Sequence, residues 1–582
     1  MFRKLIKYIR GYESAVILGP LLVIVEVLCE IGLPRLMTTI IDDGIRGTGG
    51  MRVILRTGGL MLILALCSMA AGVGSAKFTS RGSQGFGANL RKAMFDHVQE
   101  FSFADIDRFS SASLITRLTN DVNNIQRMVN MGLRILVRAP VMLVAALIVC
   151  FRLNQRLTLI LVCVIPFMAL AIGLVMHAAR RLFMVFQKKI DALNGDVQED
   201  LVAIRVVKAF VREPYEKQKF AAANDAMRDA ALAAGRRVIL MNPVMQLSFN
   251  FSIVLILWFG GHYVLSGTLS DGELYAFISY IVNVLMSVMM IAFSFLMMTR
   301  ARASAERINE VLETVPAIRD AEESAAAVLP ESLGRVELRD VSFRYTATGS
   351  GENVLSHIDM TIEPGQFVAI IGGTGSGKSS LVNLIPRFYD VTDGAVLVDG
   401  MDVRDYPLEA LRSRIGMVLQ NNVLFSGTIR ENLLWGKPDA TEEEMIRAAK
   451  DAQAYDFIMS FPDGFDTFIE QGGVNVSGGQ KQRLCIARAL LKKPKILILD
   501  DSTSAVDTRT DALIRAGFRT YIPETTKIII AQRVASVQDA DMILIMDNGH
   551  IVDRGTHDQL LKRCQIYREI YQQQTNGGGE HA

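Results

Sequence analysis

The sequence predicts a chain of two unlike parts: an N-terminal all-α domain with six membrane-spanning helices, and a C-terminal α/β domain. Of the 582 residues 50% are hydrophobic, and the long apolar runs all lie before about residue 300. Each run is close to the roughly 20 residues that a helix needs to cross a bilayer. The sequence that follows is typical of a soluble α/β domain. We therefore expect a membrane domain over 1–310, a linker over 311–334, an α/β domain over 335–573 and a polar tail over 574–582.

Six apolar runs are long enough to span a membrane, and we place them at 15–41, 54–77, 134–153, 156–178, 242–267 and 274–299. The first follows a basic segment, MFRKLIKYIR, and has no small-residue cleavage pattern. It is therefore expected to be a retained membrane helix with a cytoplasmic N-terminus. The net charge of +2 gives no general reason to expect nucleic acid binding.

The connections after the second and fourth spans are long and rich in arginine and lysine, and they cover 78–133 and 179–241. Basic connections are retained on the cytoplasmic side. Apolar residues recur in them at helical spacing, while glycine and proline are sparse. We expect membrane helices that continue far into the cytoplasm and end in short turns able to dock onto the α/β domain.

Two features inside the apolar runs could face a substrate. Glu26 and Glu30 lie four residues apart on one helix face, and intramembrane carboxylates are functional-site candidates. The alternative is that both carboxylates only pair with neighbours and help packing. The sixth span is rich in methionine, including Met289 and Met290, and methionine surfaces adapt to varied apolar ligands. Core filling is the simpler interpretation for any single methionine.

The segment FVAIIGGTGSGKSSLVNLI carries the strongest local signal in the chain. A buried strand is predicted to enter the loop Gly372–Ser379, and a helix-forming stretch follows. Glycines in such a loop let backbone N–H groups surround phosphates, Lys378 reaches the terminal phosphates, and Ser379 binds magnesium. The strand–loop–helix order predicts a nucleotide phosphate site of the P-loop type.

A second predicted strand, KILILDD, ends at Asp500, which is placed to hold magnesium. The segment NVSGGQKQRLCIARAL lies between these two elements, with Ser477 23 residues before Asp500. The SGGQ sequence of Ser477, Gly478, Gly479 and Gln480 resembles the signature of ATP-binding-cassette (ABC) proteins. Six spans before one cassette is similar to the layout of ABC half-exporters, so the resemblance covers essentially the whole chain.

The resemblance implies roles for further residues. Tyr345 matches the aromatic residue that stacks on adenine, and Gln420 matches a glutamine that contacts magnesium and senses the membrane domain. The segment Ser504–Asp507, SAVD, matches the D-loop. Residues expected to bind ATP are Tyr345, Gly372, Thr374, Gly375, Ser376, Gly377, Lys378, Ser379, Ser380, Gln420 and Asp500; of these, Ser379, Gln420 and Asp500 are the expected magnesium ligands.

In proteins of this family two cassettes meet head to tail, and each ATP lies between the phosphate loop of one and the signature of the other. The resemblance therefore implies that Ser477, Gly478, Gly479, Gln480 and Asp507 act in trans on a partner's ATP. A chain with one cassette cannot complete a site alone and must pair.

Two positions depart from the family pattern. Asp501 stands where the family has a catalytic glutamate, and a carboxylate that is one methylene shorter sits back from the attacking water, which can cost about 100-fold in rate. Gln532 stands at the position of the switch histidine and cannot take up positive charge. This combination resembles the degenerate-site subunit of bacterial heterodimeric multidrug-type exporters.

The resulting hypothesis is a cytoplasmic-membrane subunit that binds ATP and Mg²⁺, hydrolyses that ATP poorly, and completes the competent site of a partner half-exporter carrying the glutamate and histidine. The exported compounds would be hydrophobic drugs, lipids or similar molecules. One alternative is a homodimeric exporter in which Asp501 is a slow base. Another is a nucleotide-gated membrane regulator built on the same fold.

Overall fold

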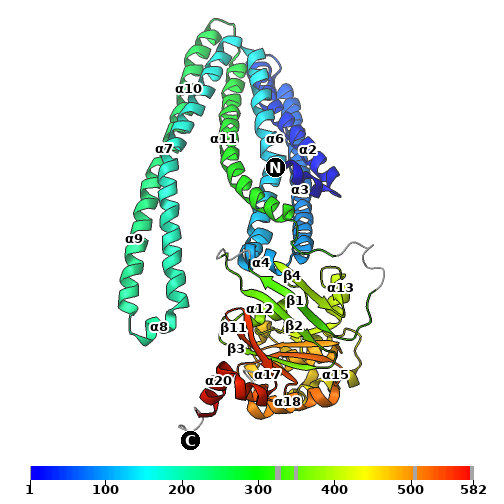
Figure 1. Ribbon diagram of the computed structural model, residues 1–582. Helices are drawn as coiled ribbons and strands as arrows, with labels where there is room; N and C mark the ends of the chain where they lie inside the picture. Colours follow the sequence, from blue (N-terminus) through cyan, green and yellow to red (C-terminus); the bar gives the residue numbers. More distant parts are fainter. Residues whose placement is uncertain (1, 321–328, 346–350, 502–506, 577–582) are drawn as a thin grey trace. The chain divides into compact units, whose positions relative to one another are not determined.

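The computed structural model describes residues 2–320, 329–345, 351–501 and 507–576. The chain divides into two compact units, each continuous in space but not in sequence. The first unit comprises Met1–His97 and Leu114–Thr314, and the second comprises Val98–Ser113 and Val315–Ala582. The second unit therefore contains a short segment from the first long connection as well as the C-terminal domain (Figure 1).

The first unit is built almost entirely from long helices. They are α1 (Phe2–Leu5), η1 (Ile6–Ile9), α2 (Glu13–Thr39), η2 (Ile40–Arg46), α3 (Gly50–Gln99), α5 (Ser111–Thr116, which begins in the second unit), η3 (Arg117–Asp121), α6 (Val122–Leu153), α7 (Gln155–Val202), α8 (Ile204–Ala209), α9 (Glu213–Val238), α10 (Met241–Leu265) and α11 (Asp271–Glu313). In the described residues six of these segments are long and apolar enough to cross a membrane. The predicted fold class is confirmed.

The long connections are helical, as predicted. The helix α3 continues without a break from its apolar part to Gln99, and α7 continues to Val202. α9 packs along α7, and the short helix α8 joins them at the tip of the hairpin (Figure 1). These extensions carry polar residues because they extend beyond the apolar spans.

The membrane helices α2, α6 and α11 pack together around an apolar core that includes Val27, Ala146 and Ile281. One polar group inside this core illustrates how such groups are paired. The buried Tyr280 donates its hydroxyl hydrogen to the Ile31 carbonyl at 2.7 Å, which satisfies a group that lipid cannot. The helix α11 begins at a capping box between Ser270 and Glu273.

The second unit contains a six-stranded sheet in the order β12–β11–β3–β10–β9–β6. Five strands are parallel and β12 is antiparallel to its neighbour. The bounds are β3 (Phe367–Gly372), β6 (Ile415–Val418), β9 (Ile496–Asp500), β10 (Thr526–Ile530), β11 (Met542–Asp547) and β12 (His550–Gly555). The parallel strands are largely apolar because helices cover both faces of such a sheet.

A smaller antiparallel sheet has the order β2–β1–β4–β5, and β7 pairs with β8. These strands are β1 (Val336–Phe343), β2 (Leu355–Ile362), β4 (Asp393–Val398), β5 (Met401–Asp402), β7 (Gly427–Thr428) and β8 (Phe468–Ile469). The helices of this unit are α4 (Phe103–Phe109), α12 (Lys378–Leu384), α13 (Leu408–Ser413), α14 (Ile429–Leu434), α15 (Glu442–Asp451), α16 (Tyr455–Ser460), η4 (Gly464–Asp466), η5 (Gln471–Gly473), α17 (Gly478–Leu491), α18 (Thr508–Tyr521), η6 (Val534–Ser536), α19 (His557–Arg563) and α20 (Gln565–Asn576).

The register of the large sheet sets the position of the candidate site. Ile530 of β10 pairs with Asp500 of β9 on one side and with Ile370 of β3 on the other. The carboxyl ends of these three parallel strands therefore lie at one edge of the sheet. The loops that leave this edge carry most of the predicted functional residues, as expected for an open α/β sheet.

The short helix α4 belongs to the second unit through a set of aromatic and polar contacts. The Phe103 ring lies 4.6 Å from the Phe388 ring, and the Tyr389 hydroxyl donates to Asp107 at 2.8 Å. Asp105 caps the start of α4 with Ser102 and also accepts from the Ala317 backbone N–H at 3.1 Å. A turn of the first long connection is therefore bound to the α/β domain, as the sequence predicts.

Candidate functional site

The loop between β3 and α12 has the backbone conformation that a phosphate site requires. Gly377 has φ +92°, and a Cβ at this position would lie 2.9 Å from the Val354 carbonyl oxygen. A Cβ at Gly372 would collide with the Met546 carbonyl oxygen. Only glycine fits both positions, so the glycines of the motif are explained by the fold as well as by phosphate chemistry.

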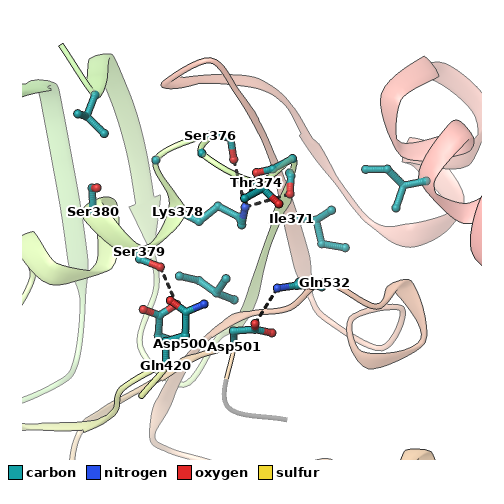
Figure 2. Close-up of a pocket in the computed structure, with 17 residues that line it drawn as sticks. Ile371, Thr374, Ser376, Lys378, Ser379, Ser380, Gln420, Asp500, Asp501 and Gln532 are labelled. Carbon is teal, nitrogen blue, oxygen red and sulfur yellow. Dashed lines mark hydrogen bonds between the residues drawn. The ribbon is translucent and has the colours of Figure 1, made fainter. Parts of the chain in front are cut away.

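Lys378 bends back over this loop. Its Nζ donates to the carbonyl oxygens of Gly372 and Gly373 at 3.0 and 2.6 Å, and contacts Ser376 Oγ at 3.2 Å (Figure 2). Burial lowers the pKa of Lys378, while Asp501 and Asp500 oppose that shift. The ammonium group thus lies inside the loop, where a phosphate oxygen could replace the weaker carbonyl acceptors.

Asp500 and Ser379 form the second part of the site. Ser379 Oγ donates to Asp500 Oδ1 at 2.9 Å, and Gln420 lines the same cavity (Figure 2). Asp500 is buried at the end of β9, and this burial raises its pKa. A hydroxyl, a carboxylate and an amide oxygen are the hard donors that Mg²⁺ prefers, and a cation would relieve the buried negative charge. These residues therefore fit a magnesium ion.

The cavity at this edge of the sheet has a volume of about 470 Å³. Predicted site residues that line it are Gly372, Thr374, Gly375, Ser376, Gly377, Lys378, Ser379, Ser380, Gln420, Asp500, Asp501 and Gln532. The cavity is also lined by Val354, from the segment before β2, and by Ile570, from α20, which were not predicted from the sequence. Neither belongs to a motif, so only the tertiary structure could reveal them.

Tyr345 lies next to this cavity, and it is not among the described residues that line it. Its hydroxyl is 2.9 Å from Ser380 Oγ on α12, and its ring packs at 5.2 Å against Tyr389. It also lines a second cavity of about 280 Å³ together with Asp107 of α4. The predicted adenine-stacking residue is therefore held by α12 and by Tyr389.

Asp501 and Gln532 contact each other. Gln532 Nε2 donates to Asp501 Oδ2 at 2.7 Å (Figure 2). The Asp501 backbone has φ +48°, a left-handed conformation that aspartate tolerates better than most residues. Burial raises the pKa of Asp501, and the bond from Gln532 and the charge of Lys378 oppose that shift. The two residues that depart from the family pattern thus form one hydrogen-bonded pair.

The signature residues lie at the start of α17. Ser477 caps this helix: the Gln480 backbone N–H donates to Ser477 Oγ at 3.2 Å, and the Ser477 N–H donates to Gln480 Oε1 at 2.9 Å. Neither residue lines the 470 Å³ cavity of its own chain. Asp507 caps α18 through a 2.9 Å bond from the Thr510 N–H, while Ser504–Val506 lie outside the described residues.

In the membrane unit, Glu26 and Glu30 of α2 share one partner, Arg138 of α6. Arg138 donates to Glu26 Oε1 at 2.5 Å and to the two oxygens of Glu30 at 2.8 and 2.7 Å. Arg138 was not predicted as their partner, although it is an arginine near the start of an apolar run. Met289 is half-buried and Met290 is exposed. Nothing in this arrangement requires a substrate, because paired ions are the usual state of intramembrane charges.

Comparisons with known proteins agree with this geometry. A model of the ABC transporter transmembrane region matches residues 16–289, and a model described as ABC transporter matches 355–504. An ABC transporter ATP-binding protein of Bacillus subtilis (strain 168), YfiB, is 38% identical over 581 residues, with 100% of both chains covered. An ATP-dependent lipid A-core flippase of Syntrophus aciditrophicus (strain SB) is 35% identical over 487 residues, which are 84% of this chain and 80% of the flippase. A solved bacterial Atm1-family ABC exporter with ATP bound matches with a TM-score of 0.81 at 25% identity, covering 98% of this chain and 99% of that chain.

Proposed function

This chain belongs to the ABC transporter family as an exporter half-transporter, and we propose that it is the degenerate-site subunit of a heterodimer. Membership establishes a multi-pass protein of the inner membrane with a cytoplasmic ATP-binding domain that works as a dimer. The finer proposal is that the ATP site of this chain hydrolyses poorly, and that the partner's site carries out most of the hydrolysis. The observation that carries it is the hydrogen-bonded pair of Asp501 and Gln532 in the nucleotide cavity.

This pair is poorly suited to hydrolysis. A general base must reach the proton of the attacking water, and Asp501 is one methylene short and already accepts a hydrogen bond from Gln532 at 2.7 Å. Gln532 can donate a hydrogen bond to a phosphate oxygen but carries no positive charge to stabilise the transition state. All the expected ATP-binding residues except Tyr345 line the same cavity as the pair, which supports a site that holds ATP rather than hydrolyses it.

The signature surface supports a role in trans. Ser477 is exposed at the N-terminus of α17, a helix of 14 residues, where backbone N–H groups and the helix dipole favour an anion. In the proposed dimer this surface covers the ATP of a partner half-exporter that carries the glutamate and the histidine. Hydrolysis there drives alternating access, while the ATP held by Lys378 and, through Mg²⁺, by Asp500 keeps the cassettes together.

The test compares ATP hydrolysis by the purified chain alone and in complex with its partner. We expect little activity alone, and in the complex Ser477→Ala should lower the rate about 100-fold, the cost of removing one transition-state donor. Because Ser477 also caps α17, Thr441→Ala is the matched control: Thr441 caps α15 in the same capping-box geometry and lies outside the nucleotide cavity. Brisk hydrolysis by the lone chain would instead favour the homodimeric exporter with Asp501 as its base.

For the exported compound we propose lipids or hydrophobic drugs. The flippase relative carries a lipid in its name, and the sixth span presents exposed methionines such as Met286 and Met290. In vesicles containing the complex, Met290→Asp should reduce ATP-dependent movement of a fluorescent phospholipid severalfold more than Met459→Asp, an exposed methionine of the cassette. Equal transport by both variants would remove the sixth span from the proposed substrate path.

A further inference from the structure

The C-terminal helix α20 (Gln565–Asn576) is fixed to the cassette core at its start. Tyr567 is fully buried, and its hydroxyl lies 2.7 Å from His557 Nδ1 of α19. Ile566, Ile570 and Tyr571 pack against the same core. The polar tail was predicted to begin at residue 574, but the helix continues to Asn576. The last turn of α20 is therefore part of the folded cassette.

Gln574, in that last turn, is bound to the loop that follows β10. Its Oε1 accepts from the Val534 backbone N–H at 2.7 Å, and its Nε2 donates to the Gln532 carbonyl oxygen at 2.7 Å. The side-chain amide of Gln574 thus satisfies the two backbone groups that flank Arg533. The backbone of a neighbouring strand would satisfy such a pair of groups in the same way. Only a side chain with both a donor and an acceptor can make this pair of bonds.

The loop that Gln574 holds is the loop that carries Gln532 into the nucleotide cavity. The Gln532 side chain donates to Asp501 at 2.7 Å, and both residues line the cavity. One helical turn before Gln574, Ile570 forms part of the same cavity wall. A continuous series of contacts therefore runs from α20 through the backbone of the loop to the edge of the site where the terminal phosphate is expected.

We infer that Gln574 is a positioning residue of the nucleotide site: it fixes the backbone at Gln532 and thereby the side chain that faces the terminal phosphate. Without it, two backbone groups of the loop that follows β10 lose these hydrogen-bond partners, and the loop gains freedom that ATP binding must then remove. This inference goes beyond the proposed function, because it holds whether or not the site hydrolyses ATP.

The test is the affinity of the purified full-length chain for the fluorescent analogue TNP-ATP with Mg²⁺. Gln574→Ala should weaken binding about fivefold, the effect of losing about one net hydrogen bond. Gln574→Glu keeps the acceptor for Val534 but sets a carboxylate oxygen against the Gln532 carbonyl, so it should weaken binding at least as much. Gln573→Ala is the matched control: it removes the same amide from the same turn of α20, but the two hydrogen bonds to the loop after β10 are made by Gln574, so the affinity should stay unchanged.

A double-mutant cycle separates positioning from a general structural role. If Gln574 acts through the side chain of Gln532, then Gln574→Ala should have no further effect in a Gln532→Ala background. Two results would overturn the inference: unchanged affinity in Gln574→Ala, or an equal loss in both backgrounds. The melting temperature of each variant without nucleotide shows whether the substitution destabilises the cassette. If Gln574→Ala unfolds α20, Gln574→Glu is used in its place. The heterodimer proposal is tested separately by hydrolysis, so either idea can fail alone.

Discussion

In the proposed head-to-tail dimer, two surfaces of the cassette would face ATP, and only one of them carries departures from the family pattern. The surface at the ends of β3, β9 and β10 keeps its glycine loop, Lys378 and Asp500, but carries the Asp501–Gln532 pair. The signature surface at the start of α17 keeps SGGQ and its capping box. The departures from the family pattern are confined to the two residues that would act on the terminal phosphate.

Under the proposed function, this difference separates the residues for binding from those for hydrolysis. The groups expected to hold the phosphates are backbone N–H groups, a lysine and a magnesium site, and all of them depend on the phosphate loop and on β9. Hydrolysis adds a base and a charged donor at the end of two strands. A sequence can therefore lose the second set while the strands, the loop and the cavity remain unchanged.

The largest effect should come from restoring the altered pair. A lone chain with Asp501→Glu and Gln532→His has an intact phosphate loop and an intact signature, so two copies can complete competent sites. ATP hydrolysis should rise about 100-fold over the unmodified chain, because a positioned base and acid contribute that much or more. Each single substitution should give a much smaller gain. An unchanged rate in the double variant would mean that another part of this site limits hydrolysis.

A smaller effect is expected from Lys378→Ala. Loss of a charged donor to the phosphates should weaken TNP-ATP binding to this chain about tenfold, at the low end of the cost of a charge-assisted hydrogen bond. Lys492→Ala is the control, because Lys492 is also partly buried and donates to two backbone carbonyls, at 2.6 and 2.9 Å, outside the nucleotide cavity. Equal losses in the two variants would indicate that both act by destabilising the cassette.

The sequence was sufficient for the fold class and for most residues that line the candidate cavity. Apolar runs of spanning length predicted the membrane helices, because a bilayer permits few other structures. The phosphate loop and KILILDD predicted β3 and β9, because the chemistry of each motif depends on the strand that precedes it. Glu26 and Glu30 were recognised as unusual, but their partner Arg138 is 112 and 108 residues away and could not be identified from spacing.

The contribution of α20 was missed for a similar reason. The segment YQQQTN is polar, so it has little of the apolar periodicity that predicts a packed helix. The helix α20 is fixed instead by the buried Tyr567 near its start and by the side-chain amide of Gln574 in its last turn. This amide binds backbone groups 40 and 42 residues earlier in the chain. Hydrogen bonds to backbone groups leave no pattern in the partner sequence, because every residue has the same backbone.

The smallest expected effect is the most decisive for the proposed function. Asp501→Asn removes the charge of the carboxylate but keeps its size and an oxygen that can accept from Gln532. If this site only holds ATP, hydrolysis by the complex should change by less than about twofold, since no proton is transferred to Asp501. A loss of about tenfold or more, or an active lone chain that Asp501→Asn inactivates, would identify Asp501 as a working base. The two ATP-facing surfaces would then belong to one self-sufficient homodimer, and the hydrogen bond from Gln532 would have to break or shift during each turnover.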